Sequence, residues 1–446
     1  MAKQSTHYTC KSCNYQTLKW VGCCPGCSEW ESFTTKTNTP SSGKHSSLQK
    51  TAMVSLDSVD IKPQKRMLSG VQEWDRVLGG GVVPGSLLIL TGDPGIGKST
   101  LLLQVTNKLA QNRKVFYFST EESIQQVAAR AQRLHCDSTT LLFSDCADLE
   151  TIVNTALTEK PDVIVIDSIQ NCRNTNTHNF PGSVGQLRES TFRLMQLAKE
   201  NNIAVIISGH ITKEGSIAGP KTLEHMVDGV FYLQGEGRWQ TRILRSVKNR
   251  FGTINEVGFF KMGETGLCQV PNINEHLIKE LTYAPGSSLI SILQGSRPLL
   301  LELQALTIVT KLTIPQRVIA GVDHKQVVLI AAILEKYLQV KLSAHDIFFK
   351  ISGATLKLKD SVSDLGIALA LLSSYFQQPL PEKSISLGEI SVTGQIKPIN
   401  QIDILVREAQ SFGIKKILVA KNQKIENSIC ASVRFSNVYE LLSLFS

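Results

Sequence analysis

The segment at residues 92–100, which reads Gly-Asp-Pro-Gly-Ile-Gly-Lys-Ser-Thr, constrains the fold of this chain more than any other stretch. It fits the phosphate-binding loop pattern, in which a strand runs into a glycine-rich turn and a helix follows. The apolar run at residues 87–90 supplies the strand, and the leucine-rich residues 101–109 continue as a helix. Glycines allow consecutive backbone N–H groups to approach phosphate at a helix N-terminus. The sequence therefore predicts a nucleoside triphosphate site.

Each part of this loop has an expected role. Lys98 would place its charge on the β- and γ-phosphates, and the Ser99 hydroxyl would complete the coordination shell of a Mg²⁺ ion. We expect ATP to be bound by the whole loop, which comprises Gly92, Asp93, Pro94, Gly95, Ile96, Gly97, Lys98, Ser99 and Thr100.

Further buried strands are predicted at residues 114–118, 162–166 and 203–207. The second of these ends in Asp167, as in a Walker B strand that holds the metal through water. After the first strand come Glu121 and Glu122, where a carboxylate could act as general base for the attacking water. Because strands alternate with helices, we expect an α/β fold with a parallel, doubly wound sheet and the ligand at its carboxyl edge.

The N-terminal region carries two C-x-x-C pairs, Cys10 with Cys13 and Cys24 with Cys27, separated by ten residues. Four thiolates at this spacing can bind Zn²⁺ tetrahedrally, and about thirty residues need such a staple to fold. The two-residue spacing selects Cys24 over its neighbour Cys23 as the ligand. The alternative, a redox pair of cysteines, is less favoured because no thioredoxin-like βαβ pattern surrounds them.

Length and charge limit the remaining possibilities. A chain of 446 residues is too long for one ordinary core, so two or three domains are expected. The net charge of +9 favours polyanionic partners without identifying them. Apolar runs are too short to span a membrane, and residues after Lys3 lack the apolar stretch of a signal peptide. We therefore expect a cytoplasmic protein with no membrane partner and with reduced cysteines.

A basic stretch follows the last predicted strand of the sheet. Between Arg238 and Lys261, Glu256 is the single acidic residue. Such a stretch is a basic hairpin or strand edge, and it could supply an arginine finger or only a solvated face. His210, at the end of the preceding strand, could sense the γ-phosphate or serve only the structure. The basic residues concerned are Arg238, Arg242, Arg245, Lys248, Arg250 and Lys261.

Four segments resemble signatures of the bacterial RadA (Sms) family of DNA repair and recombination ATPases: residues 181–188, 209–215, 217–228 and Lys-Asn-Arg-Phe-Gly at 248–252. The resemblance implies a RecA/DnaB-like core that assembles into a homo-hexameric ring. It also implies binding of single-stranded and branched DNA, branch migration of recombination intermediates, and partnership with a RecA-type recombinase. By the same resemblance Glu121 is the catalytic glutamate, and Lys248 and Arg250 act on ATP bound to the neighbouring subunit.

The C-terminal part resembles the Lon protease domain at residues 388–394 and 398–399. Aligned to it, Ser363 falls at the position of the nucleophile, but Asp403 replaces the lysine base. A carboxylate cannot replace a desolvated amine as activator, so we expect a proteolytically inactive α+β fold. The expected domains are a zinc finger (1–35), a flexible linker (36–64), a RecA-like ATPase (65–265), a second linker (266–287) and the Lon-like domain (288–446).

Two classes of function therefore remain. The favoured one is a DNA-dependent, helicase-like ATPase that uses ATP, Mg²⁺ and Zn²⁺. The rival is an ATP-dependent Lon-like protease, supported by the C-terminal fold and Ser363. A RecA-family regulator of the circadian-clock type would suit the Glu121–Glu122 pair, but it explains neither the cysteines nor the C-terminal domain.

Overall fold

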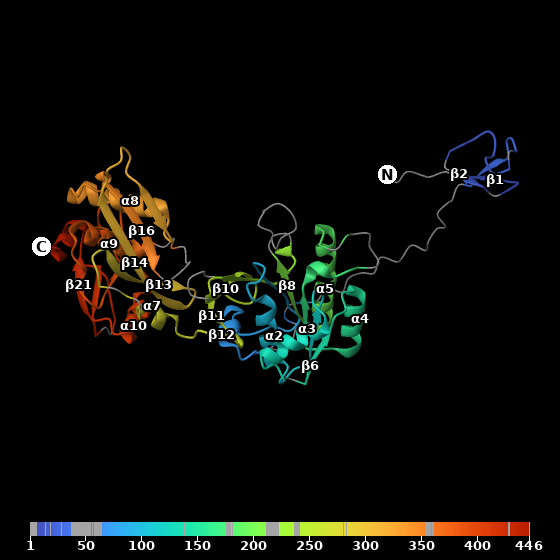
Figure 1. The fold of residues 1–446 in the computed structure, drawn as a ribbon, viewed down its shortest axis with the longest axis horizontal. Coiled ribbons are helices and arrows are strands. Elements are labelled where there is room, and N and C mark those ends of the chain that lie inside the picture. Colours follow the sequence, from blue (N-terminus) through green and yellow to red (C-terminus); the bar gives the residue numbers. More distant parts are fainter. Residues whose placement is uncertain are drawn as a thin grey trace. The chain divides into compact units, whose positions relative to one another are not determined.

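The chain divides into two compact units, Met1–Pro63 and Gln64–Ser446. Figure 1 presents the computed structural model. No helix in its described part is long and apolar enough to cross a membrane. The structure describes residues 7–13, 15–17, 19–27, 29–36, 55, 57, 65–137, 139–174, 180, 182–210, 223–235, 241–279, 281, 283–352, 358, 361–426 and 429–445. Residues 211–222, which include much of the resemblance segments 209–215 and 217–228, lie outside these residues, as does most of the predicted linker 36–64.

The first unit contains a small antiparallel sheet with the strand order β2-β1-β3. Its strands are β1 (His7–Cys10), β2 (Gln16–Thr17) and β3 (Phe33–Lys36). Among its described residues, the buried apolar ones are few: Cys10, Cys24 and Phe33. So small an apolar core cannot offset the chain entropy lost on folding, which is the reason for a metal staple.

The central domain of the second unit is built on a nine-stranded sheet of order β12-β11-β10-β9-β4-β8-β7-β5-β6. The strands from β9 to β6 in this order are parallel, as predicted. They are β4 (Leu87–Gly92), β5 (Val115–Ser119), β6 (Leu141–Ser144), β7 (Val163–Asp167), β8 (Ala204–His210) and β9 (Gly229–Gly235).

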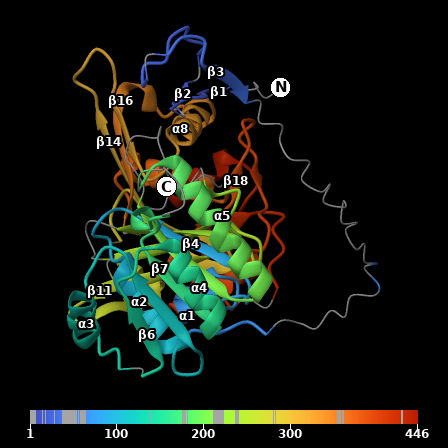
Figure 2. The ribbon, with the colours of Figure 1, turned by 90° about the vertical axis from the view of Figure 1, so that its right-hand side faces the viewer.

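Helices cover both faces of this sheet, so the central strands are apolar on both sides. Along β4, Leu88 and Leu90 pack into the core with α1 (Gln72–Val77), α2 (Lys98–Leu109) and α3 (Ile124–Arg133). Leu87 and Ile89 pack into the opposite core with α4 (Leu149–Glu159) and α5 (Val184–Asn201). These last two helices lie side by side, joined by an ion pair between Glu150 and Arg193 (Figure 2).

Three antiparallel strands extend the sheet beyond β9: β10 (Thr241–Asn249), β11 (Val257–Gly263) and β12 (Gly266–Gln269). The basic stretch thus forms a β-hairpin, one of the two forms expected. The predicted second linker, residues 266–287, differs from the structure. It contains β12, which pairs with β11, and α7 (Ile273–Lys279), which packs beside the C-terminal domain through Asn274.

The C-terminal domain contains a mixed sheet of order β13-β14-β16-β15 and a parallel sheet of order β17-β20-β21. The almost wholly buried helix α9 packs between them, with α8 beside it. The elements are β13 (Ser287–Gln294), β14 (Arg297–Val309), β15 (Arg317–Ala320), α8 (His324–Leu338), η3 (Leu342–Ala344), β16 (His345–Ser352), η4 (Ser361–Ser363), α9 (Asp364–Phe376), β17 (Ser384–Leu387), β18 (Glu389–Ile390), β19 (Ile396–Lys397), α10 (Ile402–Ser411), β20 (Lys416–Ala420), β21 (Ala431–Phe435) and η5 (Val438–Leu444).

Candidate functional site

The glycine-rich loop joins β4 to α2 at the carboxyl edge of the sheet, where the sequence predicted it. Gly92 has φ +154°, and a Cβ there would lie 2.3 Å from the Leu233 carbonyl oxygen. Gly97 has φ +111° and precedes the first residue of α2. Both positions therefore require glycine, and α2 begins with its N-terminus at the loop.

Lys98 lies inside this loop and exposes 5% of its surface. Its Nζ donates hydrogen bonds to the carbonyl oxygens of Gly92 (2.9 Å) and Asp93 (3.0 Å). Burial lowers the pKa of Lys98, against the opposing effect of the carboxylates of Asp167, Glu121 and Asp93. The structure thus gathers the lysine and the predicted acidic residues at one place.

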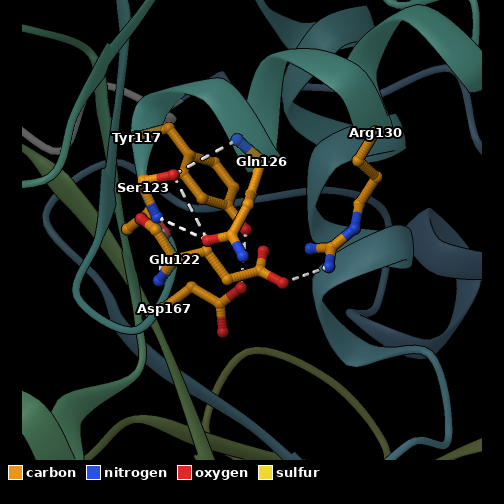
Figure 3. A network of polar contacts seen from close by, with 7 residues as sticks. Tyr117, Glu122, Ser123, Gln126, Arg130 and Asp167 are labelled. Carbon is orange, nitrogen blue, oxygen red and sulfur yellow. Dashed lines mark hydrogen bonds and ion pairs between the residues drawn. The ribbon is translucent and has the colours of Figure 1, made fainter.

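Asp167 ends β7 beside the loop and is held through both carboxylate oxygens. The Tyr117 hydroxyl donates to Oδ2 at 2.8 Å (Figure 3), and Ser208 Oγ donates to Oδ1. Burial and the Asp167 charge raise the pKa of Tyr117 well above its usual value, so it stays a donor. Sequence reasoning missed both partners, although a tyrosine in a fully buried strand signals a hidden hydrogen-bond acceptor.

The structure distinguishes Glu121 from Glu122. Ser168 Oγ donates to Glu121 Oε1, and Glu121 is among the carboxylates that act on Lys98. Glu122 instead forms an ion pair with Arg130 of α3, in the network of Figure 3. Glu121 is therefore the carboxylate that faces the phosphate site.

The same edge of the sheet offers ligands for a divalent cation. Asp167 provides a carboxylate and Ser99, in the first turn of α2, provides a hydroxyl. Such hard oxygen ligands fit Mg²⁺, which on binding would neutralise phosphate charge. His210 ends β8, but its side chain lies outside the described residues.

Lys248 and Arg250 belong to residues 248–252, which we call the finger segment. This segment lies at the amino ends of the parallel strands, opposite the carboxyl edge that carries the loop. Asn249 pairs with Gly229, and Gly229 pairs with Leu88 near the start of β4. The loop begins at Gly92, four residues further along β4, or about 13 Å at 3.3 Å per residue. Arg250 therefore does not lie at the nucleotide loop of its own chain.

Asp228 holds the finger segment in place. Its side chain is 3% exposed, and it accepts hydrogen bonds from Arg250 Nη1 (3.1 Å), Lys199 Nζ (2.7 Å) and Leu87 N (3.0 Å). Burial raises the pKa of Asp228, but the bonds from Lys199, Leu87 and Arg250 outweigh it and leave the pKa below its usual value. Arg250 remains 56% exposed, and Lys248 Nζ donates to the Glu224 carbonyl oxygen.

The first unit contains four cysteines that could hold a metal ion. The sulfur atoms of Cys10, Cys13, Cys24 and Cys27 lie within 4.8 Å of one another. The Cys10–Cys27 and Cys13–Cys24 separations of 3.6 and 3.4 Å approach the ~3.8 Å between sulfurs on a tetrahedral zinc.

The aromatic residues around the metal centre differ in their packing. Cys23 is outside the four-sulfur group and forms a β-bridge with Trp30. Trp20 packs edge-on against Tyr8 and Phe33. Trp30, by contrast, remains 75% exposed.

In the C-terminal domain, Ser363 is fully buried at the start of α9. Its neighbour Asp364 accepts hydrogen bonds from Gln326 Nε2 (2.7 Å) and Ile390 N (3.1 Å). Asp403 lies in the first turn of α10 and accepts a hydrogen bond from Glu426 N. These contacts give both carboxylates structural roles, and Ser363 exposes none of its surface.

The two adjacent glutamates give a matched test. We expect Glu121→Gln to lower ATP turnover by about 100-fold or more, because a general base typically contributes 10²–10⁴-fold. Glu122→Gln should change turnover less than about threefold, because it removes only a partly exposed ion pair. Steady-state ATPase assays, with nucleotide affinity measured for each variant, check this. Equal losses would contradict the assignment of Glu121.

The metal centre gives a second prediction. Cys24→Ser should abolish stoichiometric zinc binding and unfold the first unit, because three thiolates no longer close the tetrahedron. Cys23→Ser should keep one zinc per chain. Elemental analysis of the purified variants measures this, and the reverse result would show that the ligand was misidentified.

Comparisons with known proteins agree with this architecture. Residues 66–216 match the family model described as AAA domain, residues 315–423 that of subunit ChlI of Mg-chelatase, and residues 8–35 that of a rubredoxin metal binding domain. The chain is therefore an ATPase of the P-loop class with a Lon-like C-terminal domain, as predicted.

Three curated relatives cover nearly the full chain, and each is named DNA repair protein RadA. The relative from Listeria monocytogenes is 42% identical over 95% of this chain and 93% of its own length. The Streptococcus pyogenes relative is 43% identical over 95% and 94%. The Aquifex aeolicus relative is 39% identical over 96% of both. Since identity at this level extends over all three parts of the molecule, the chain belongs to the RadA family.

Proposed function

We propose that this protein is a DNA-dependent ATPase that works as a homo-hexameric ring and drives branch migration in recombination and repair. The observation that carries the proposal is the position of Arg250. It lies at the sheet edge opposite its own loop, exposed and oriented by Asp228. An arginine too far from the nucleotide of its own chain is suited to contact the nucleotide of a neighbouring chain. Such a contact would require the chains to assemble.

The proposed chemistry uses the residues gathered at the loop. Lys98 and the loop N–H groups bind the phosphates. Ser99 and Asp167 would hold a Mg²⁺ ion, which would neutralise phosphate charge. Glu121, oriented by Ser168, accepts a proton from the attacking water. Arg250 and Lys248 of the adjacent subunit would stabilise the charge that develops on the γ-phosphate.

The proposed substrate is single-stranded and branched DNA, in cooperation with a RecA-type recombinase. The relatives' name supports a role in DNA repair. The net charge of +9 favours a polyanion, and the zinc unit presents Trp30 at 75% exposure, a side chain able to stack on a base.

The rival function, an ATP-dependent protease, is less consistent with the C-terminal domain. Ser363 is fully buried and Asp403 is engaged with Glu426 N. A serine nucleophile needs an adjacent base and an accessible hydroxyl. We propose that the domain is proteolytically inactive and serves assembly and DNA binding.

A first experiment separates the two functions. ATP turnover should rise severalfold when single-stranded DNA is added at low salt, and this stimulation should fall as salt increases, because phosphate contacts release counterions. Lys98→Ala should reduce turnover by about 100-fold or more with the fold intact, because it removes charge stabilisation from the transition state. Casein should remain undigested throughout. ATP-dependent digestion of casein with no DNA response would favour the protease.

A second experiment tests action between subunits. Arg250→Ala should lower turnover by about 1,000-fold without preventing nucleotide binding, and Arg250→Lys should restore it only partly, because lysine lacks the planar fork. We call the Arg250→Ala chain the loop donor and the Lys98→Ala chain the finger donor. Mixing them should recover DNA-stimulated ATPase, because some interfaces combine an intact loop with an intact finger. No recovery despite demonstrated subunit exchange would contradict action in trans.

A further inference from the structure

The turn between β13 and β14 brings the C-terminal domain into contact with the central domain. Arg297, the first residue of β14, is 8% exposed, and its partner Glu73 on α1 is 1% exposed. Nη1 of Arg297 donates to both carboxylate oxygens of Glu73, at 2.9 and 3.2 Å. Nη2 donates to the Pro271 carbonyl oxygen, and the guanidinium lies 5.3 Å from the centre of the Phe259 ring. Both terminal nitrogens of the guanidinium therefore have hydrogen-bond partners.

Glu73 also connects Arg297 to the central sheet through its own hydrogen bonds. Its Oε2 also accepts a hydrogen bond from Phe259 N of β11 (2.9 Å), and its own N–H donates to Gln269 Oε1 of β12 (3.1 Å). A carboxylate buried to this degree requires its cation, because an unpaired buried charge is strongly unfavourable. Arg76, which lies 3.8 Å from Glu73, is on α1 itself, so Arg297 is the cation that connects Glu73 to β14.

The other end of α1 holds the finger segment. Asn249 Nδ2 donates to the Val77 carbonyl oxygen at 3.4 Å. Gly252 approaches Gly79 so closely that a Cβ on Gly252 would lie 3.0 Å from the Gly79 Cα. Arg66 donates to the carbonyl oxygens of both Gly79 and Phe251 and so ties the two segments together. With six residues, α1 is a short, rigid bridge between Glu73 and this contact.

We propose that Arg297 is a positioning residue for Arg250: the C-terminal domain, through Glu73 and α1, sets the finger segment in the orientation that serves the neighbouring subunit's nucleotide. This rests on the proposed action of Arg250 in trans. The C-terminal domain thereby influences ATP hydrolysis without contacting ATP, and the effect is confined to the subunit that donates the finger.

The mixed-chain assay tests this directly. Arg297→Lys keeps a charge beside Glu73 but loses the planar guanidinium, which bonds Glu73 through Nη1 and Pro271 through Nη2 at the same time. Placed in the finger donor, it should lower the recovered ATPase at least tenfold. Placed in the loop donor, whose finger is already absent, it should lower recovery less than twofold. A merely structural defect would reduce recovery equally in both placements, and that result, or no loss in either, would overturn the proposal.

Controls keep the outcomes distinct. Lys279→Met removes an exposed ion pair between Lys279 and Glu275, both on α7, and should leave the recovered ATPase activity unchanged in either donor. The Glu73→Gln, Arg297→Gln double variant removes both charges together and should show the same asymmetry if Arg297→Lys fails to fold. If the mixture of unmodified donors recovers nothing although subunits exchange, the action in trans fails, and this inference fails with it.

Discussion

The parallel pairing of β4 with β8 on one side and β9 on the other is the constraint on which the functional geometry depends. It places the loop after Gly92 at one edge of the sheet, beside Asp167. It places the finger segment at the amino edge, because the end of β10 pairs with the start of β9 and Arg250 bonds Asp228 there. The length of β4 thus separates the nucleotide loop from the finger segment, and this separation is the basis of the proposed action of Arg250 on a neighbouring subunit.

Much of the central domain was accessible from the sequence because its signals are local. The glycine pattern predicts the strand before it and the helix after it. In the same way, a β-branched run that ends in aspartate predicts a buried strand. The second linker was not, because β12 is four residues long and its pairing with β11 is a tertiary contact that composition does not encode. Asn and Pro at residues 271–274 favoured a loop, and the helix α7 begins within that stretch at Ile273.

The site shows the same division. Two adjacent glutamates after a strand are equivalent in sequence, and only the path of the turn decides that Glu121 meets Ser168 while Glu122 meets Arg130. The partners of Asp167 come from two other strands, which no spacing rule connects to it. The family resemblance assigned roles to Glu121 and Arg250. The physical argument for the proposed action between subunits needed the strand register, which only the structure gives.

Buried charge shows how the domains are coupled. Two buried carboxylates lie next to the finger segment or to the helix that contacts it. Asp228 pairs directly with Arg250. Glu73, on α1, pairs with Arg297. A buried ion pair contributes little net stability compared with apolar packing, yet losing one partner is costly. Such pairs therefore act more as determinants of geometry than as sources of stability. On that argument, the proposed role of the Lon-like domain in ATP hydrolysis depends on the geometry that the Arg297–Glu73 pair imposes on α1.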